Sequence, residues 1–278
     1  MINILYSGND KVFDGMLTCS LSILKRSRND EPITFYVLTM NVSHLREDYV
    51  PISDEKIKFF EDVIKEYNSE NRAIKIDVTE LYMKEFDKCP NEGAYCSPYT
   101  LLRLFADMVD LPDKILYLDV DLLFNKDIHL LWDLDLGDYE YFASRDHYGK
   151  FLIKPNYINA GVLLFNLKKM KETNLLGKAR ELIKTKKLTF ADQSAIIRST
   201  TKRKVLSQRF NDQKFLYKNT VIRHFSKRLF WLPYPHTDNI KQWQIDRVHK
   251  VFKYHCFDDI LFEYQQLKTR FEREQNNE

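Results

Sequence analysis

Residues 113–128 read DKILYLDVDLLFNKDI, and this segment decides the fold. An apolar strand at 114–119 ends in two carboxylates, Asp119 and Asp121, which are separated by a single residue. In an open α/β sheet, ligands bind beyond the carboxyl ends of the strands. The segment therefore predicts a buried strand that delivers two acidic side chains into a ligand site.

The segments on either side alternate between strand and helix patterns. Further strands are expected at residues 2–7, 33–39, 74–78, 140–145, 161–167 and 220–225. Helices are expected at 13–27, from Ser53 to about 67, from Ser97 to about 109 and at 191–199, with both serines as N-caps. This alternation predicts an α/β fold with a mostly parallel central sheet.

A change in composition near Leu229 divides the chain. FWLPYP (230–235) begins a stretch rich in proline and aromatic residues, and a helical run follows from about 240 to 273. We expect one domain over residues 1–235 and a helical, basic and aromatic C-terminal appendage over residues 236–278.

Composition excludes several classes of protein. The seven glycines are never two or five positions apart, which excludes the standard Rossmann and Walker A loops. The longest uncharged run, residues 32–45, is shorter than the roughly 18 residues that a membrane-spanning helix needs. The N-terminus lacks the pattern of a secretory signal, and the four cysteines form no C-x-x-C pair. We expect a cytoplasmic protein, with peripheral contact at the inner face of the membrane left open.

The two aspartates suggest a hard divalent cation, Mn²⁺ or Mg²⁺, since both ions prefer oxygen ligands. A second Asp-x-Asp triplet, Asp133-Leu-Asp135, competes for this role. It follows a short helical turn and is typical of a solvated cap. The first triplet ends a buried strand, where uncompensated carboxylates are costly, and is therefore the better candidate.

Three blocks together resemble glycosyltransferase family 8: YLDVDLLFNKDIHLLW (117–132), YINAGVLLFNLKK (157–169) and TFADQSAI (189–196). The resemblance runs from about residue 2 to about 228. It implies a GT-A fold for the 1–235 domain, with Mn²⁺ or Mg²⁺ as cofactor. It also implies retaining transfer of glucose or galactose from a UDP-hexose. The implied acceptor is a glycan, glycolipid or glycoprotein in bacterial surface polysaccharide synthesis.

The resemblance also implies roles for individual residues. Asp119, Asp121 and His224 match metal ligands, and Asp192 and Gln193 match the catalytic pair at the reactive carbon of the sugar. The implied donor-binding residues are Tyr6, Ser7, Asn9, Asp10, Arg103, Asp119, Val120, Asp146, Asn159, Ala160, Gly161, Lys227 and Arg228.

Two blocks depart from the family pattern. Asn9 stands where many relatives carry Asp, and an Asx turn is the alternative interpretation of that loop. The last block, HFSKRLFWLPYP, lacks the glycine and the K-P-W of the usual H-[YF]-x-G-x-x-K-P-W. Which of Lys227 and Arg228 would meet the diphosphate is therefore left open.

Residues 223–257 mix basic and aromatic side chains, with seven Lys or Arg against two Asp. This mixture suits contact with an anionic membrane, but it equally suits aromatic residues packed on the main domain beneath a solvated basic face. No nucleic-acid partner is expected from a net charge of only +3. A sugar nucleotidyltransferase and a non-catalytic nucleotide-sugar-binding module remain the alternative functions.

Overall fold

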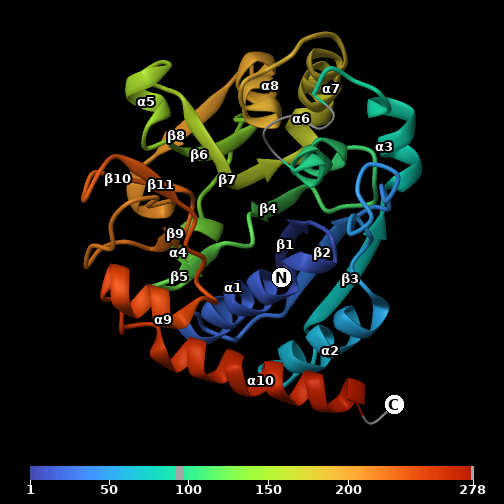
Figure 1. Ribbon diagram of the computed structural model, residues 1–278. Coiled ribbons are helices and arrows are strands. Elements are labelled where there is room, and N and C mark those ends of the chain that lie inside the picture. Colours follow the sequence, from blue (N-terminus) through green and yellow to red (C-terminus); the bar gives the residue numbers. More distant parts are fainter. Residues whose placement is uncertain (92–96, 277–278) are drawn as a thin grey trace.

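The computed structural model describes residues 1–91 and 97–276. A seven-stranded sheet with the order β3-β2-β1-β4-β7-β6-β8 forms its centre (Figure 1). Its strands are β1 (Ile2–Ser7), β2 (Ile33–Thr39), β3 (Arg72–Asp77), β4 (Lys114–Leu118), β6 (Tyr141–Arg145), β7 (Ile158–Asn166) and β8 (Arg203–Leu206). Neighbours run parallel except where β7 meets β4 and β6. The predicted mostly parallel α/β sheet is therefore confirmed.

Helices cover both faces of this sheet. In Figure 1, α1 (Phe13–Arg26), α2 (Asp54–Lys65) and α10 (Asp258–Asn276) lie below it, and α6 (Leu167–Thr173), α7 (Leu175–Thr185) and α8 (Ala191–Ser199) lie above it. The remaining helices are α3 (Thr79–Phe86), α4 (His129–Trp132), α5 (Gly149–Leu152), α9 (Ile245–Arg247), the 3₁₀ helices η1 (Asp10–Val12), η2 (Pro98–Phe105) and η3 (Gln208–Phe210), and the π-helix η4 (Val248–Phe252).

Alternation along each strand divides the core into two clusters. Leu116 and Leu118 of β4 belong to the cluster between the sheet and helices α1 and α2, whereas Ile115 and Tyr117 belong to the cluster between the sheet and helices α7 and α8. Successive strand residues point to opposite faces, so a strand buried on both faces must be apolar throughout. This explains why the strand sequences show near-continuous apolar runs.

The reversal of β7 shapes one edge of the sheet. Because β7 is antiparallel to β4, Val162 near its start pairs with Leu118 at the end of β4. Two further strands, β5 (Leu122–Phe124) and β9 (Ile222–His224), pair antiparallel just beyond that edge, with Leu122 opposite His224. The carboxyl end of β4, the amino end of β7 and the end of β9 therefore meet in one place.

The C-terminal part packs on the sheet domain. α10 runs alongside α1, with ion pairs from Lys25 to Glu263 and from Lys268 to Asp14. A hairpin formed by β10 (Arg228–Phe230) and β11 (His236–Asp238) precedes it. Phe252 and Tyr254 are half-buried and surround the guanidinium of Arg223 on β9.

Several elements differ from the sequence-based expectations. The helix expected from Ser97 to about 109 is the 3₁₀ helix η2, which ends at Phe105, and β7 begins three residues before the expected strand at 161. The helical run expected over 240–273 is interrupted after η4, where Lys253 has a φ of 57° and so cannot continue a helix. Gly93 and Cys96 lie outside the described residues. Within the described ranges, none of the helices is long and apolar enough to cross a membrane.

Candidate active site

Three candidate metal ligands meet at the end of β4. The ligand atoms of Asp119, Asp121 and His224 all lie within 4.8 Å of one another. Asp119 and Asp121 follow β4 directly, and the pairing of β5 with β9 brings His224 to them, although it lies 103 residues after Asp121 in the sequence. Two carboxylates and one imidazole are a suitable donor set for a divalent cation such as Mn²⁺.

A buried amide fixes the orientation of the His224 ring. Asn211 Oδ1 lies 2.9 Å from His224 Nδ1, so that nitrogen carries the proton and donates it. His224 Nε2 lies 3.0 Å from Asp121 Oδ1 and would present its lone pair to a cation bound beside it, because the proton of the neutral ring stays on Nδ1. Holding a histidine in its metal-binding tautomer through the other ring nitrogen is a common device of metal sites. Asn211 was not predicted from the sequence, because one amide in a loop gives no recognisable pattern.

Lys241 occupies the other side of Asp121. Its Nζ lies 2.5 Å from Asp121 Oδ2 and donates to the Phe225 carbonyl at 3.3 Å. Burial alone would raise the pKa of Asp121, but Lys241 and then His224 outweigh it and lower that pKa. The carboxylate is therefore ionised and ready to hold a cation.

Lys241 was not among the predicted donor-binding residues, yet a signal for it exists. Lys241-Gln242-Trp243 matches the K-P-W of the family block at two of its three positions. The β10–β11 hairpin separates these residues from His224 in the sequence. Gln242 donates to the Val120 carbonyl at 2.7 Å, and Trp243 packs near Gly15 of α1. The segment is thereby held under the Asp119–Asp121 loop.

Gly161 allows the three ligands to approach one another. A Cβ atom at this position would lie 2.5 Å from His224 Cε1 and 2.7 Å from Asp119 Oδ2. Both separations are well below van der Waals contact, so a larger residue would displace the ligands. The Gly161 backbone also accepts a hydrogen bond from the Asp119 N–H at 2.8 Å.

Arg103 links the metal ligands to the predicted catalytic pair. Its guanidinium is almost fully buried, with Nη2 3.0 Å from Asp119 Oδ1 and Nε 3.2 Å from Asp192 Oδ2. It also donates to the Ala160 carbonyl. Burial raises the pKa of Asp192, and Arg103 partly offsets that rise. Arg103, Asp119 and Asp192 thus form one ionic network.

Gln193 stands beside this network. Its Oε1 accepts a hydrogen bond from the Ala160 N–H at 3.0 Å. Because Ala160 lies on β7 between Asn159 and Gly161, the amide is fixed to the strand that borders the metal ligands. The structure therefore brings Gln193, Asp192 and Ala160 together, as the family resemblance implies.

A chain of hydrogen bonds connects Asp146 to the metal ligands. Asp146 Oδ2 accepts from Asn159 Nδ2 at 3.0 Å, and Asn159 Oδ1 accepts from Asn211 Nδ2 at 2.8 Å. Asn211 in turn holds His224. The other oxygen of Asp146 accepts from the backbone N–H groups of Tyr148 and Gly149 at the start of α5.

The first strand places the side chains of Tyr6 and Ser7, both predicted to bind the donor, on opposite faces of the sheet. Ser7 reaches the site, because its hydroxyl lies 3.0 Å from Tyr117 OH, which in turn donates to Asp119 Oδ1. The Tyr6 side chain lies fully buried in the core, stacked on Phe35, and does not border the metal ligands.

Asn9 and Asp10 make local contacts. Asn9 Oδ1 accepts from the Lys11 N–H at 3.3 Å, which is the Asx turn that the sequence left as an alternative. Asp10 pairs with Lys56 at 2.5 Å and accepts from the Ser53 N–H. Lys227 and Arg228 line a cavity beside Asp146, whereas Lys241 contacts Asp121 and Arg103 contacts Asp119.

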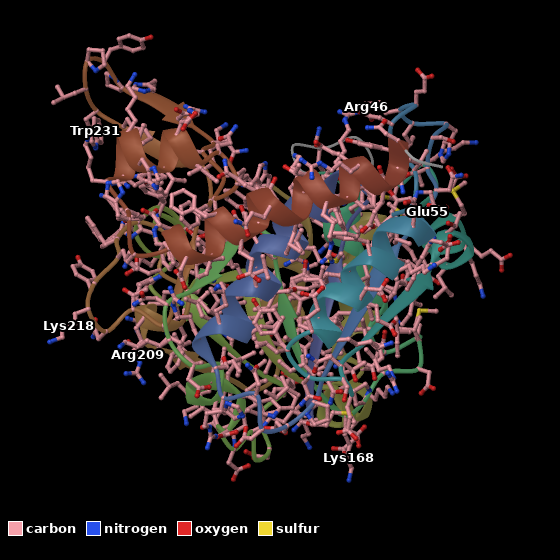
Figure 2. The ribbon with its side chains drawn as sticks, turned by 90° about the horizontal axis from the view of Figure 1, so that it is seen from below. Arg46, Glu55, Lys168, Arg209, Lys218 and Trp231 are labelled. Atoms are coloured by element: carbon pink, nitrogen blue, oxygen red, sulfur yellow. The ribbon has the colours of Figure 1, made fainter. Side chains whose placement is uncertain are left out.

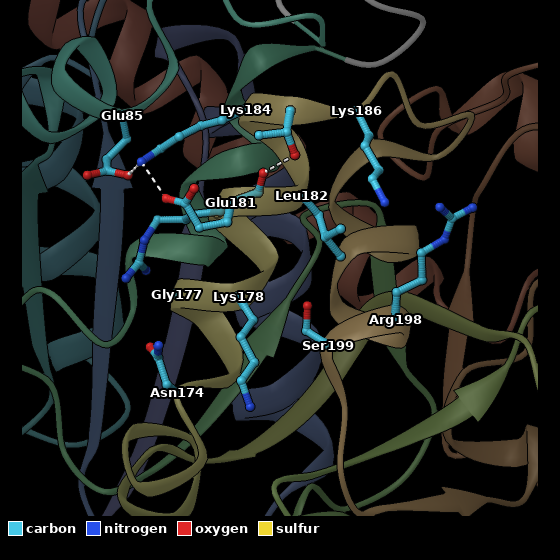
Figure 3. A pocket seen from close by; sticks show the side chains of 12 residues that line it. Glu85, Asn174, Gly177, Lys178, Glu181, Leu182, Lys184, Lys186, Arg198 and Ser199 are labelled. Carbon is cyan, nitrogen blue, oxygen red and sulfur yellow. Dashed lines mark hydrogen bonds and ion pairs between the residues drawn. The ribbon is translucent and has the colours of Figure 1, made fainter.

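The second triplet and another hollow are separate from this site. Asp133 and Asp135 are exposed, and Asp135 accepts from the Gly137 N–H in a turn. A pocket of about 780 Å³ lies on α7 and α8, and Figure 3 shows the side chains that line it. Lys184 in this pocket forms ion pairs with both Glu85 and Glu181 (Figure 3). Neither Asp119 nor Asp121 is among the residues that line it.

Comparison with known proteins identifies the family to which the chain belongs. Residues 3–229 match the model of glycosyl transferase family 8, and the chain therefore belongs to that family. Glycosyltransferase GlyF of Streptococcus pneumoniae is 27% identical over 161 residues, covering 58% of this chain and 35% of the relative. The chain spans about half or less of the length of the curated relatives it matches.

Solved structures give the same fold. The galactosyltransferase LgtC, in complex with donor and acceptor sugar analogs, superposes with a TM-score of 0.63 at 19% identity, covering 96% of this chain and 95% of LgtC. Glycosyltransferase GlyE of Streptococcus pneumoniae gives a TM-score of 0.64 at 19% identity, covering 95% and 63%. The chain has the GT-A fold and belongs to glycosyltransferase family 8.

Proposed function

We propose that the protein is a metal-dependent, retaining hexosyltransferase that uses UDP-glucose or UDP-galactose. Its acceptor would be a glycan, glycolipid or glycoprotein of bacterial surface polysaccharide synthesis. The observation that supports this most strongly is the meeting of Asp119, Asp121 and His224 at one sheet edge, beside Arg103 and Lys241. Two anionic ligands, one imidazole and two cations suit a bound metal and a diphosphate together.

The residues have distinct roles in this proposal. Asp119, Asp121 and His224 would hold Mn²⁺ or Mg²⁺, which as a Lewis acid stabilises negative charge on the departing diphosphate. Asn211 keeps the lone pair of His224 directed at the site. Lys241 neutralises Asp121 in the absence of a donor and would turn to the diphosphate when a donor binds. Arg103 keeps Asp119 in place.

The contacts of Gln193 bear on the stereochemistry. Retention by double displacement needs a nucleophile on the face opposite the leaving group, and retaining glycosidases use a carboxylate. An amide oxygen is a poor nucleophile, and Gln193 Oε1 already accepts from Ala160. Asp192, the carboxylate that precedes Gln193 in the sequence, is buried against Arg103. We therefore favour front-face attack, with Gln193 stabilising positive charge on the sugar and Asp192 holding its hydroxyls.

The test is the release of UDP from a panel of nucleotide sugars, with Mn²⁺ or with EDTA. The expected result is UDP release from UDP-glucose or UDP-galactose that EDTA abolishes and Mn²⁺ restores. Formation of UTP from UDP-hexose and pyrophosphate would instead reveal a nucleotidyltransferase. Tight donor binding with no turnover in the presence of any acceptor extract would reveal a binding module.

A further inference from the structure

Six large apolar side chains project from two neighbouring segments and are here called the apolar rim. Phe151, Leu152 and Ile153, at and just beyond α5, are 77%, 81% and 49% exposed. Trp231, Leu232 and Tyr234, at the tip of the β10–β11 hairpin, are 68%, 83% and 67% exposed. Figure 2 shows Trp231 on a hairpin that stands away from the body of the molecule. Large exposed apolar patches generally mark interaction sites.

The two segments of the rim border one cavity. Leu152 and Ile153 form one wall of a cavity of about 450 Å³, and Arg228, Leu229 and Thr237 of the hairpin form the other. The Leu229 N–H donates to Tyr148 OH at 3.3 Å, which ties the hairpin to the start of α5. Leu152 and Ile153 of the rim therefore line the same cavity as the base of the hairpin that carries the other rim segment.

The cavity leads toward the active site. Asp146, Asn159 and Gln213 line its polar part. Asn159 is one hydrogen bond from Asn211, which holds the metal ligand His224. The cavity thus combines polar residues that connect by hydrogen bonds to the metal ligands with apolar residues of the rim.

Basic residues flank the rim. Lys227 and Arg228 lie on the hairpin side, and Lys150 and Lys154 lie on the α5 side. Burial, together with Lys214 and Lys150, lowers the pKa of His147, as expected where positive charges gather. Asp146, the carboxylate that lines the cavity, is occupied by three hydrogen-bond donors. Apolar tips with basic flanks complement an interface of acyl chains and anionic headgroups.

We propose that the apolar rim inserts into the surface of an anionic membrane, so that the cavity opens toward the bilayer and receives a lipid-linked acceptor. The claim that the cavity receives a lipid-linked acceptor rests on the proposed function, whereas the claim that the rim inserts into the membrane does not. It places the membrane contact at the rim and not along the whole basic stretch 223–257. In that stretch Lys241 is engaged with Asp121, and Arg247 is paired with Asp238 at 2.5 Å.

The test is sedimentation with vesicles of phosphatidylglycerol and phosphatidylcholine, compared with phosphatidylcholine alone. The rim variants are Trp231→Ser with Leu232→Ser, and Phe151→Ser with Leu152→Ser. The control, Leu130→Ser with Phe262→Ser, removes side chains that are 42% and 50% exposed on α4 and α10. We expect anionic vesicles to bind the wild type and the control, and each rim variant to bind at least about tenfold more weakly, since burying one such side chain is worth roughly that much.

A second readout locates the contact. Brominated lipids should quench tryptophan fluorescence of the wild type, and Trp231→Phe should lose this quenching while still binding vesicles. Equal vesicle binding by the rim variants and the wild type would overturn the proposal, as would wild-type protein that stays soluble with anionic vesicles. UDP release without acceptor separates the two claims. Rim-dependent binding with no UDP release would sink the proposed function alone, and UDP release without vesicle binding would sink the docking alone.

Discussion

Replacing Gly161 by alanine tests whether this glycine allows the metal ligands to converge. The added methyl group would lie 2.5 Å from His224 Cε1 and 2.7 Å from Asp119 Oδ2. Carbon atoms normally approach to about 3.5–4.0 Å, so the imidazole must retreat by roughly 1 Å. Overpacking of this kind costs about 1–3 kcal/mol of stability. Disturbing the groups that orient a metal ligand typically lowers metal affinity by about 10- to 100-fold.

The assay combines urea unfolding with calorimetric titration of Mn²⁺. Gly137→Ala is the matched control, because it adds the same methyl group where no atom lies within 4 Å. Gly137 has a φ of 49°, so its replacement should cost about 1 kcal/mol through backbone strain and leave Mn²⁺ affinity unchanged. Wild-type Mn²⁺ affinity in folded Gly161→Ala would refute the reasoning.

Three further outcomes are expected at the same site. Asn211→Ala should lower Mn²⁺ affinity about 10- to 100-fold by calorimetry, because His224 loses the acceptor that fixes its tautomer. Lys241→Ala should tighten Mn²⁺ binding without nucleotide, since no ammonium competes for Asp121, and should raise the KM for the UDP-hexose; unchanged values of both would remove Lys241 from the site. Gln193→Ala should lower kcat by about 10- to 10³-fold without abolishing turnover, and a hexose found covalently on Gln193 by mass spectrometry would contradict front-face attack.

Local sequence patterns predicted the end of β4 and the start of α2. The apolar run before Asp119 and Asp121 is a buried strand, and Ser53 caps α2 by accepting from the Lys56 N–H, because both features depend on neighbouring residues. The direction of β7 was not predicted. A strand's own sequence does not encode whether its neighbour runs parallel or antiparallel, and that direction is what places Gly161 beside Asp119.

Residues that act through long-range contacts were harder to find. The position of His224 came from the family resemblance, and its contact with Asp121 depends on the pairing of β5 with β9. Lys241 was hidden because the β10–β11 hairpin lies between it and His224, so the spacing of the family block no longer holds. Donor binding by Tyr6 stays a prediction, and its side chain points from β1 into the core against α1, where it contacts Ser20. Neighbouring positions on one strand face opposite sides, and only Ser7 faces the site.

The most direct measurement compares metal-dependent UDP release by the wild type, Asp121→Asn and Asp133→Asn, each confirmed as folded. Both changes replace a carboxylate by an amide, but only Asp121 lies among the candidate metal ligands, whereas Asp133 is exposed on the surface. A bound metal supplies several kcal/mol to such a reaction, so Asp121→Asn should lower UDP release by about 10³-fold while Asp133→Asn matches the wild type. Equal loss in the two variants, or wild-type turnover that EDTA leaves unchanged, would contradict the account.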